Sequence, residues 1–263
     1  MNYLRDHTVL AAIVVVVGST VLGVAGLLVT LRVTPRSLRS EDTEVKAAFL
    51  SMVGVLYAIL LAFVVVAVWS DFSDAAQTSQ LEVTRLANLL RDAGPLPVAD
   101  RVAVRRDVLT YTRRVVDDEW PTMAEGRESP AAAAAYRGIW SAHYRLRPTT
   151  EAQRAFYGEA VTRINDLGQN RRLRIISSRS TVSAPMWILL IAGFVASTVF
   201  TYLFDFSSRT IHVLSVATIT GLTAFVLFLI YALQHPFAGS IAVSPAPYVE
   251  LLQQWGPATL GRP

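Results

Sequence analysis

The clearest pattern in the sequence is four long stretches of hydrophobic residues, none of which contains Asp, Glu, Lys or Arg. They cover residues 8–31, 47–69, 184–203 and 211–233. The hydrocarbon core of a bilayer is about 30 Å thick, so a helix that crosses it needs about 20 apolar residues. In lipid, each backbone amide must be hydrogen-bonded within its own segment, which makes such stretches helical. The sequence therefore predicts four transmembrane helices.

The section between the second and third stretches, residues 70–183, is polar and shows no alternation of the kind that strands require. No helix breaker follows Trp69 until Gly94-Pro95, so the second membrane helix is expected to continue into water. Further helices are expected over residues 99–120 with Pro121 as the end, over residues 131–143, and from the cap at Thr149-Thr150 back towards the membrane.

This pattern predicts an all-α fold with four transmembrane helices in two hairpins and a soluble helical bundle inserted between spans two and three. Residues 234–263 form a Pro-rich C-terminal tail. A short amphipathic piece at residues 248–255 is expected either to lie on the membrane surface or to pack on the bundle.

Composition agrees with a membrane protein. Hydrophobic residues make up 52% of the chain and charged residues 17%, against about 25% charged in a typical soluble domain. The chain has no Cys, which excludes disulfides, thiolate metal sites and a Cys nucleophile. The positive-inside rule leaves the orientation open, because both sides carry cations near span ends: Arg32, Arg36, Arg39 and Lys46 on one, Arg171, Arg172, Arg174 and Arg179 on the other.

Candidate chemistry is sparse. The His residues lack metal-ligand spacing, and His212 at the start of the fourth span is interpreted as an interfacial side chain in preference to a proton relay. The acidic run Asp117-Asp118-Glu119 points around a helix and is interpreted as a solvated helix end. No phosphate-binding loop or nucleophile motif is present. We therefore expect no catalytic site, no metal site and no cofactor.

Small residues recur every four positions in three of the spans. This spacing lets helix backbones approach closely in lipid, and whether it serves packing within one subunit or between subunits is left open. The residues are Gly54, Ala58 and Ala62, then Gly193, Ser197 and Thr201, then Ala217 and Gly221.

The second span has a further property. Its interior is apolar, and Asp71 and Asp74 follow directly after it. If several copies surround an axis, these carboxylates form a ring at a pore mouth, and such rings favour cations. The alternative is ordinary charge on a helix surface.

Several segments resemble the bestrophin-like domain family of bacterial membrane proteins, over about residues 47–252. They are the run from Gly54 to Phe63, Glu119-Trp120-Pro121 with Met123, Arg171-Arg172-Leu173-Arg174 with Ser178-Arg179-Ser180, and His235-Pro236-Phe237-Ala238-Gly239 with Val243-Ser244-Pro245.

The resemblance implies a multi-pass protein of the bacterial inner membrane and a homo-oligomeric ion channel, pentameric as in bestrophins, with inorganic ions as partners. It also implies that the second span lines the pore, through Leu60 and Phe63 on one face or Tyr57, Leu61 and Val64 on another. The alternative is a non-conducting scaffold or sensor whose bundle binds a partner.

Overall fold

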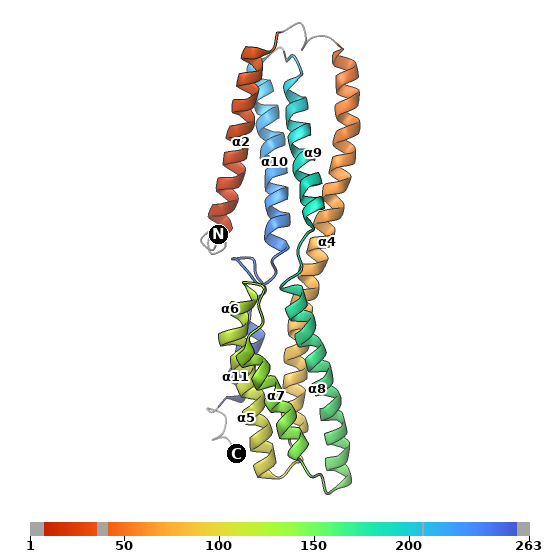
Figure 1. Cartoon of the computed structure of the whole chain (residues 1–263), viewed down its shortest axis with the longest axis vertical. Coiled ribbons are helices and arrows are strands. Elements are labelled where there is room, and N and C mark those ends of the chain that lie inside the picture. Colours follow the sequence, from red (N-terminus) through yellow and green to blue (C-terminus); the bar gives the residue numbers. More distant parts are fainter. Residues whose placement is uncertain (1–7, 36–41, 207, 257–263) are drawn as a thin grey trace. The chain divides into compact units, whose positions relative to one another are not determined.

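The computed structural model describes residues 8–35, 42–206 and 208–256. Arg36 and Arg39, which entered the orientation argument, lie outside these residues. The described chain consists of helices and contains no strand (Figure 1). Four helices are long and apolar enough to cross a membrane. The predicted all-α class with four membrane helices is confirmed.

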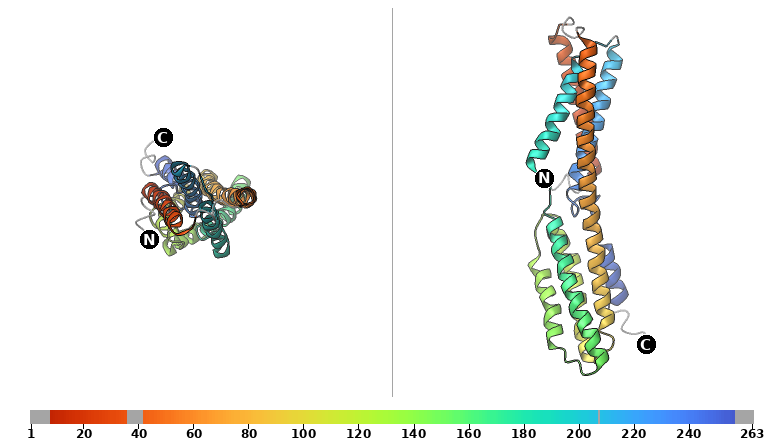
Figure 2. Two further views of the ribbon diagram at one scale, coloured as in Figure 1. Left: turned by 90° about the horizontal axis from the view of Figure 1, so that it is seen from above. Right: turned by 90° about the vertical axis from the view of Figure 1, so that its right-hand side faces the viewer.

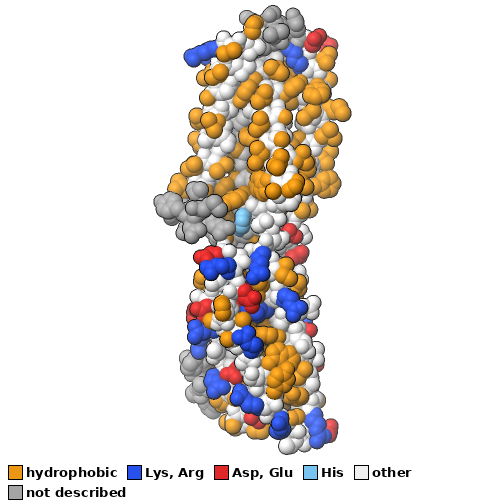
Figure 3. All heavy atoms as spheres, in the orientation of Figure 1, with side chains coloured by type: hydrophobic (Ala, Val, Ile, Leu, Met, Phe, Trp, Pro, Cys, Tyr) orange, Lys and Arg blue, Asp and Glu red, His pale blue; other side chains and the backbone are white. Residues whose placement is uncertain are grey.

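The chain forms two compact units. The first contains the described parts of residues 1–70, 181–234 and 239–241, and the second those of residues 71–180, 235–238 and 242–263. On the face shown in Figure 3, hydrophobic side chains cover the helices of the first unit, and charged side chains are spread over the second.

The first unit is built from α2 (Thr8–Val33), the first part of α4 (Thr43–Asp92), α9 (Ala184–Tyr202) and α10 (Arg209–Leu233). Helix α2 packs along α10, and α9 contacts both (Figures 1 and 2). Glycines make this packing close. A Cβ on Gly23 would stand 2.6 Å from Thr220, and one on Gly26 would stand 2.7 Å from the Tyr202 hydroxyl.

His212 is buried near the start of α10. Its Nε2 lies 3.1 Å from the carbonyl oxygen of Thr201, and its ring lies 4.6 Å from that of Phe206. Because a carbonyl oxygen only accepts, Nε2 carries the proton of this hydrogen bond. The imidazole thereby links the start of α10 to the end of α9.

Helix α4 is continuous over 50 residues and ends before Gly94-Pro95, as the absence of an earlier breaker predicts. In the second unit its later part packs with α5 (Val98–Arg114), a π-helical segment at Val115–Glu119, α6 (Trp120–Met123), α7 (Pro130–Arg145), α8 (Glu151–Ser177) and α11 (Ala246–Trp255). The core of this bundle is a continuous cluster that includes Leu86, Leu89, Val108, Ile164 and Leu167.

Helix α8 begins as expected, with a capping box in which Thr150 and Gln153 bond to each other's backbone amides. The prediction that Pro121 ends a helix is wrong, because the helical turns continue to Met123. Pro121 lies in the first turn of α6, where its missing N–H is not needed. The π-helical segment before it absorbs the change of register.

The C-terminal amphipathic piece is α11, and it packs against α5 in the second unit. Tyr248 and Leu251 are buried there. Arg105 of α5 donates through Nε to the carbonyl oxygen of Trp255 over 3.1 Å. Of the two predicted placements, the structure shows packing on the bundle. The last predicted tail residues, 257–263, lie outside the described chain.

Candidate functional site

The membrane part of α4 contacts its own chain along one narrow face. Tyr57 donates from its hydroxyl to the carbonyl oxygen of Leu190 on α9 over 2.8 Å. A Cβ on Gly193 would overlap the Tyr57 ring, so the glycine makes room for it. Val64 and Val68 are buried on the same face of α4.

The other residues of this segment are exposed or only partly buried. In the most apolar 18-residue stretch of α4 only 6% of the residues are buried, against 22% in the corresponding stretches of α9 and α10. Both Figures 1 and 2 show α4 at the edge of the first unit, apart from α2. Val55, Ile59 and Phe63 form a row at four-residue spacing, with exposed fractions of 59%, 49% and 72%. This face requires lipid or another protein surface as its neighbour.

The predicted pore residues therefore divide between two surroundings. Tyr57 and Val64 face the chain's own α9 side, Leu60 and Leu61 are partly buried, and Phe63 is fully on the exposed side. Asp71 and Asp74 are both exposed on α4 just after its apolar part.

The small residues divide in the same way. Gly193 of α9 and Gly221 of α10 pack within the chain, Gly221 with a Cβ position 3.0 Å from Thr20. The small residues of α4 do not, since a Cβ on Gly54 would meet nothing within 4 Å and Ala58 and Ala62 are exposed. Ser197 and Ala217 are partly buried, and Thr201 is buried.

The second unit contains a buried ionic cluster centred on Arg174 of α8. Its side chain and those of Glu82 on α4 and Glu119 in the π-helical segment are each 0% exposed. Arg174 donates from Nε and Nη2 to the two carboxylate oxygens of Glu82, over 2.8 and 3.1 Å. Nη2 also reaches Glu119 at 2.7 Å. One guanidinium thus joins α4 to the π-helical segment.

Further groups complete the cluster. Arg171 donates from Nη2 to Glu119 over 2.6 Å and to Glu128 over 2.9 Å. The Tyr111 hydroxyl donates to Glu82 over 2.5 Å. The rings of Trp120 and Tyr248 lie 5.5 and 5.8 Å from the Arg174 guanidinium carbon, within cation–π range.

Burial and neighbouring charges shift the pKa of three groups in this cluster. Burial lowers the pKa of Arg174, but Glu82, Tyr248 and Tyr111 raise it, and the net result is well above its ordinary value. Burial, followed by the charge of Glu82, raises the pKa of the Tyr111 and Tyr248 hydroxyls. The cluster thus pairs the guanidiniums of Arg171 and Arg174 with the buried side chains of Glu82 and Glu119, with half-exposed Glu128 at its edge.

The interpretation of residues 117–119 as a solvated helix end is wrong for Glu119. Asp117 is exposed, and Asp118 pairs with Arg114 at the surface over 3.0 Å. If the helix continued as a regular α-helix in the register of Val108, Tyr111 and Val115, Thr122 would face the core. The π-helical segment adds one residue, and after it Met123 is buried in place of Thr122, while Glu119 lies one turn after buried Val115.

The expectation that Arg171 and Arg174 act as cations beside a span end is wrong, because both are buried in ion pairs and do not face lipid headgroups. A sequence signal for the cluster exists. Glu82 stands in the buried stripe Ala75, Ser79, Leu86, Leu89, and both Arg residues continue the stripe Ala160, Ile164, Leu167. A charge at such a position indicates a buried partner.

The cluster lacks the features of a catalytic or metal site. No group of three or more His, Asp or Glu side chains among the described residues is placed to hold a metal ion. Both core carboxylates are already bonded to guanidiniums. The arrangement connects helices of the bundle to α4 and does not present a reactive group.

Comparisons with known proteins agree with this architecture. A search of curated proteins finds no match. Among solved structures, a point variant of a bacterial bestrophin homologue from Klebsiella pneumoniae is similar with a TM-score of 0.71 at 15% identity, over 91% of this chain and 98% of that one. A structure described as a membrane protein variant is similar with a TM-score of 0.71 at 17% identity, over 92% and 98% of the two chains.

These likenesses describe the fold. The sequence itself matches the bestrophin-like domain over residues 17–248, which includes most of α2, all of α4, α9 and α10, the charge cluster and the start of α11. This chain is a membrane protein that belongs to the bestrophin-like domain family.

Proposed function

We propose that this chain forms a homo-oligomeric ion channel in the bacterial inner membrane, with one α4 from each copy around a central pore. The observation that carries the proposal is the exposed apolar face of α4, the least buried of the four membrane helices. The family supports the same assembly, since bestrophin homologues are known as oligomeric channels. We propose a pentamer on that resemblance.

The narrowest part of the pore is assigned to the row Val55, Ile59 and Phe63. Four helical residues rise about 6 Å, so the row forms three successive apolar rings. A constriction of this kind excludes ions by dewetting and conducts when it widens. Phe63 is retained from the expected pore residues. Tyr57 and Val64 are not assigned to the pore, because they already pack towards α9.

Asp71 and Asp74 give the proposed channel a cation preference. Both carboxylates are exposed on α4, and a ring of them lowers the energy of cations near the pore mouth. The effect is electrostatic, so it weakens as salt shortens the Debye length from about 10 Å at 0.1 M to about 3 Å at 1 M.

Ion flux into liposomes that contain the purified protein tests conduction. We expect Phe63→Ala to raise flux several-fold, because a smaller apolar ring dewets less readily. Phe225→Ala on α10 is the matched control, since Phe225 is also exposed but lies on another helix, and it should leave flux unchanged. The oligomeric state of the wild-type protein is also determined from its mass in detergent.

Two results would reject the proposal. One is a monomer that passes no ions under any ionic condition, which favours the scaffold or sensor. The other is equal flux in the Phe63→Ala and Phe225→Ala proteins. If flux is present, reversal potentials of the Asp71→Asn/Asp74→Asn protein test selectivity, and we expect them to move towards zero most strongly at low salt.

A further inference from the structure

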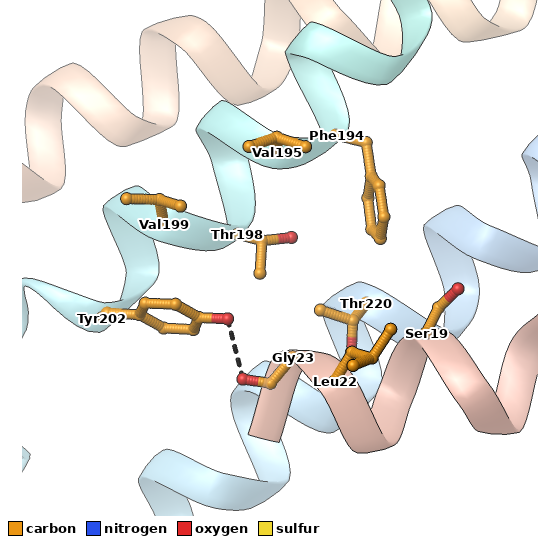
Figure 4. A pocket seen from close by; sticks show the side chains of 9 residues that line it. All are labelled: Ser19, Leu22, Gly23, Phe194, Val195, Thr198, Val199, Tyr202 and Thr220. Atoms are coloured by element: carbon orange, nitrogen blue, oxygen red, sulfur yellow. Dashed lines mark hydrogen bonds between the residues drawn. The ribbon is translucent and has the colours of Figure 1, made fainter. Parts of the chain in front are cut away.

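The membrane helices of the first unit enclose a second feature, a pocket between α2, α9 and α10 (Figure 4). Its volume is about 210 Å³. The walls are mostly apolar, with Leu22 of α2 and Val195 and Val199 of α9 at exposed positions. The pocket therefore opens towards the lipid phase.

One polar group in this pocket has no partner. Thr198 is 7% exposed, and its buried hydroxyl makes no hydrogen bond with any described residue. Other threonines of these helices behave differently: Thr20, Thr30, Thr201 and Thr220 each donate to the carbonyl oxygen four residues earlier, over 2.7–2.9 Å. In Figure 4 the Thr198 side chain projects from α9 towards α2 and α10.

Three other hydroxyls line the pocket, those of Ser19, Tyr202 and Thr220. The Tyr202 hydroxyl donates to the carbonyl oxygen of Gly23 over 2.7 Å, and the Thr220 hydroxyl donates to Val216. Their donor hydrogens are used, but each oxygen still has a lone pair. Besides Ser19, the pocket thus offers the free donor of Thr198 and the acceptors of Tyr202 and Thr220 in an apolar surrounding, where an unmade hydrogen bond is costly.

We propose that this pocket binds a small apolar alcohol that enters from the bilayer. A hydroxyl accepts from Thr198 and donates to Tyr202 or Thr220, which an acyl chain of a bulk lipid cannot do. The size agrees, because a cavity of about 150 Å³ holds a benzene-sized molecule and this one is somewhat larger. The apolar tail lies against Leu22 and the α9 valines. The proposal does not depend on conduction.

Photolabelling tests the proposal directly. The purified protein in phosphatidylcholine nanodiscs is irradiated with a diazirine-bearing octanol, and labelled peptides are quantified by mass spectrometry. We expect labelling of pocket residues that excess octanol removes and octane does not. Loss of one hydrogen bond in lipid weakens binding about three- to tenfold, which is the loss expected for Thr198→Val at limiting probe.

Two variants make the result specific. Thr198→Ser keeps the hydroxyl and should retain the labelling. Ser197→Ala is the matched control, since Ser197 also has a buried hydroxyl without a partner but does not line the pocket. Valine matches threonine in size, serine lacks its methyl group, and thermal unfolding checks that each protein is folded.

Four outcomes would overturn the proposal. Labelling that is as dense at other lipid-exposed positions such as Ile13 means that bulk lipid fills the pocket. Equal competition by octane and octanol removes the role of the hydroxyl, and so does labelling of Thr198→Val that equals labelling of the wild-type protein. Pocket residues that stay unlabelled in the intact protein indicate that a second copy covers the opening.

Discussion

Replacement of Arg174 with methionine tests whether the buried ionic cluster holds the bundle together. Methionine fills much of the space but cannot pair with carboxylates. Glu82 then keeps only the Tyr111 hydroxyl among the contacts described, while Glu119 keeps Arg171. The change therefore leaves one buried carboxylate without a cation.

The magnitude follows from the burial of this pair. Removing one partner of a buried ion pair costs about 3–5 kcal/mol, because the other charge stays desolvated. For a chain of this size 1 kcal/mol corresponds to about 2–4 °C in Tm. We therefore expect the Tm of the Arg174→Met protein to fall by about 6–20 °C.

The assay is thermal unfolding of the purified protein in detergent, followed by circular dichroism and tryptophan fluorescence. Arg172→Met is the matched control, because Arg172 lies between Arg171 and Arg174 on the same helix but is exposed, and the Tm of this variant should change by less than about 2 °C. Glu82→Gln is combined with Arg174→Met, because glutamine keeps the shape of the Glu82 side chain and removes the charge that Arg174→Met leaves unpaired.

The double variant should lose less stability than the sum of the two single variants, by about 0.5–3 kcal/mol. The reasoning is refuted if Arg174→Met unfolds within about 2 °C of the wild type, or if the two changes add without coupling. Either result means that the pair does not hold α8 to α4.

Two more substitutions probe separate contacts. Burial lowers the pKa of His143, with partial opposition from its bond to Ile139 and from Asp107, so the folded protein binds this proton less readily than the unfolded chain. The contribution of His143 to stability is complete above about pH 6.5 and is lost as pH falls below that value. In the His143→Gln protein the drop in Tm between about pH 7.5 and pH 5.5 should therefore be smaller than in the wild type. An equal drop in the two proteins contradicts the assignment. Gly193→Ala forces the ring of Tyr57 away from α9 and should cost about 1–3 kcal/mol in thermal unfolding. Gly18→Ala, where a Cβ meets nothing within 4 Å, should not destabilise, and equal losses in the two variants would contradict the packing.

Much of the fold follows from simple rules in the sequence. Uncharged runs of membrane length predict α2, α9 and α10, and the absence of a breaker before Gly94 predicts the full length of α4. The prediction that Pro121 ends a helix was wrong because the effect of a proline depends on the helical register of the residues before it. A π-helical segment depends on tertiary contacts, and the sequence of residues 115–119 does not predict it.

The charge cluster was hidden for a related reason. Glu119 belongs to an acidic run, and such runs are usually solvated. Its burial depends on its ion pairs with Arg171 and Arg174 of α8, which the local sequence does not show. Glu82 offered a better signal, since it interrupts a stripe that is otherwise buried. The stripe indicates that a partner exists, but only the fold tells which cation it is.

The most direct test of the α4 pore uses the absence of Cys from the chain. A single Phe63→Cys substitution is treated with a charged methanethiosulfonate reagent during flux measurements, with Phe225→Cys as control. Only a thiolate in water reacts readily with such a reagent. We predict rapid modification and loss of flux for Phe63→Cys and neither effect for Phe225→Cys; a Phe63→Cys protein that stays unmodified and conducts normally would show that this face of α4 lies in lipid and not in a pore.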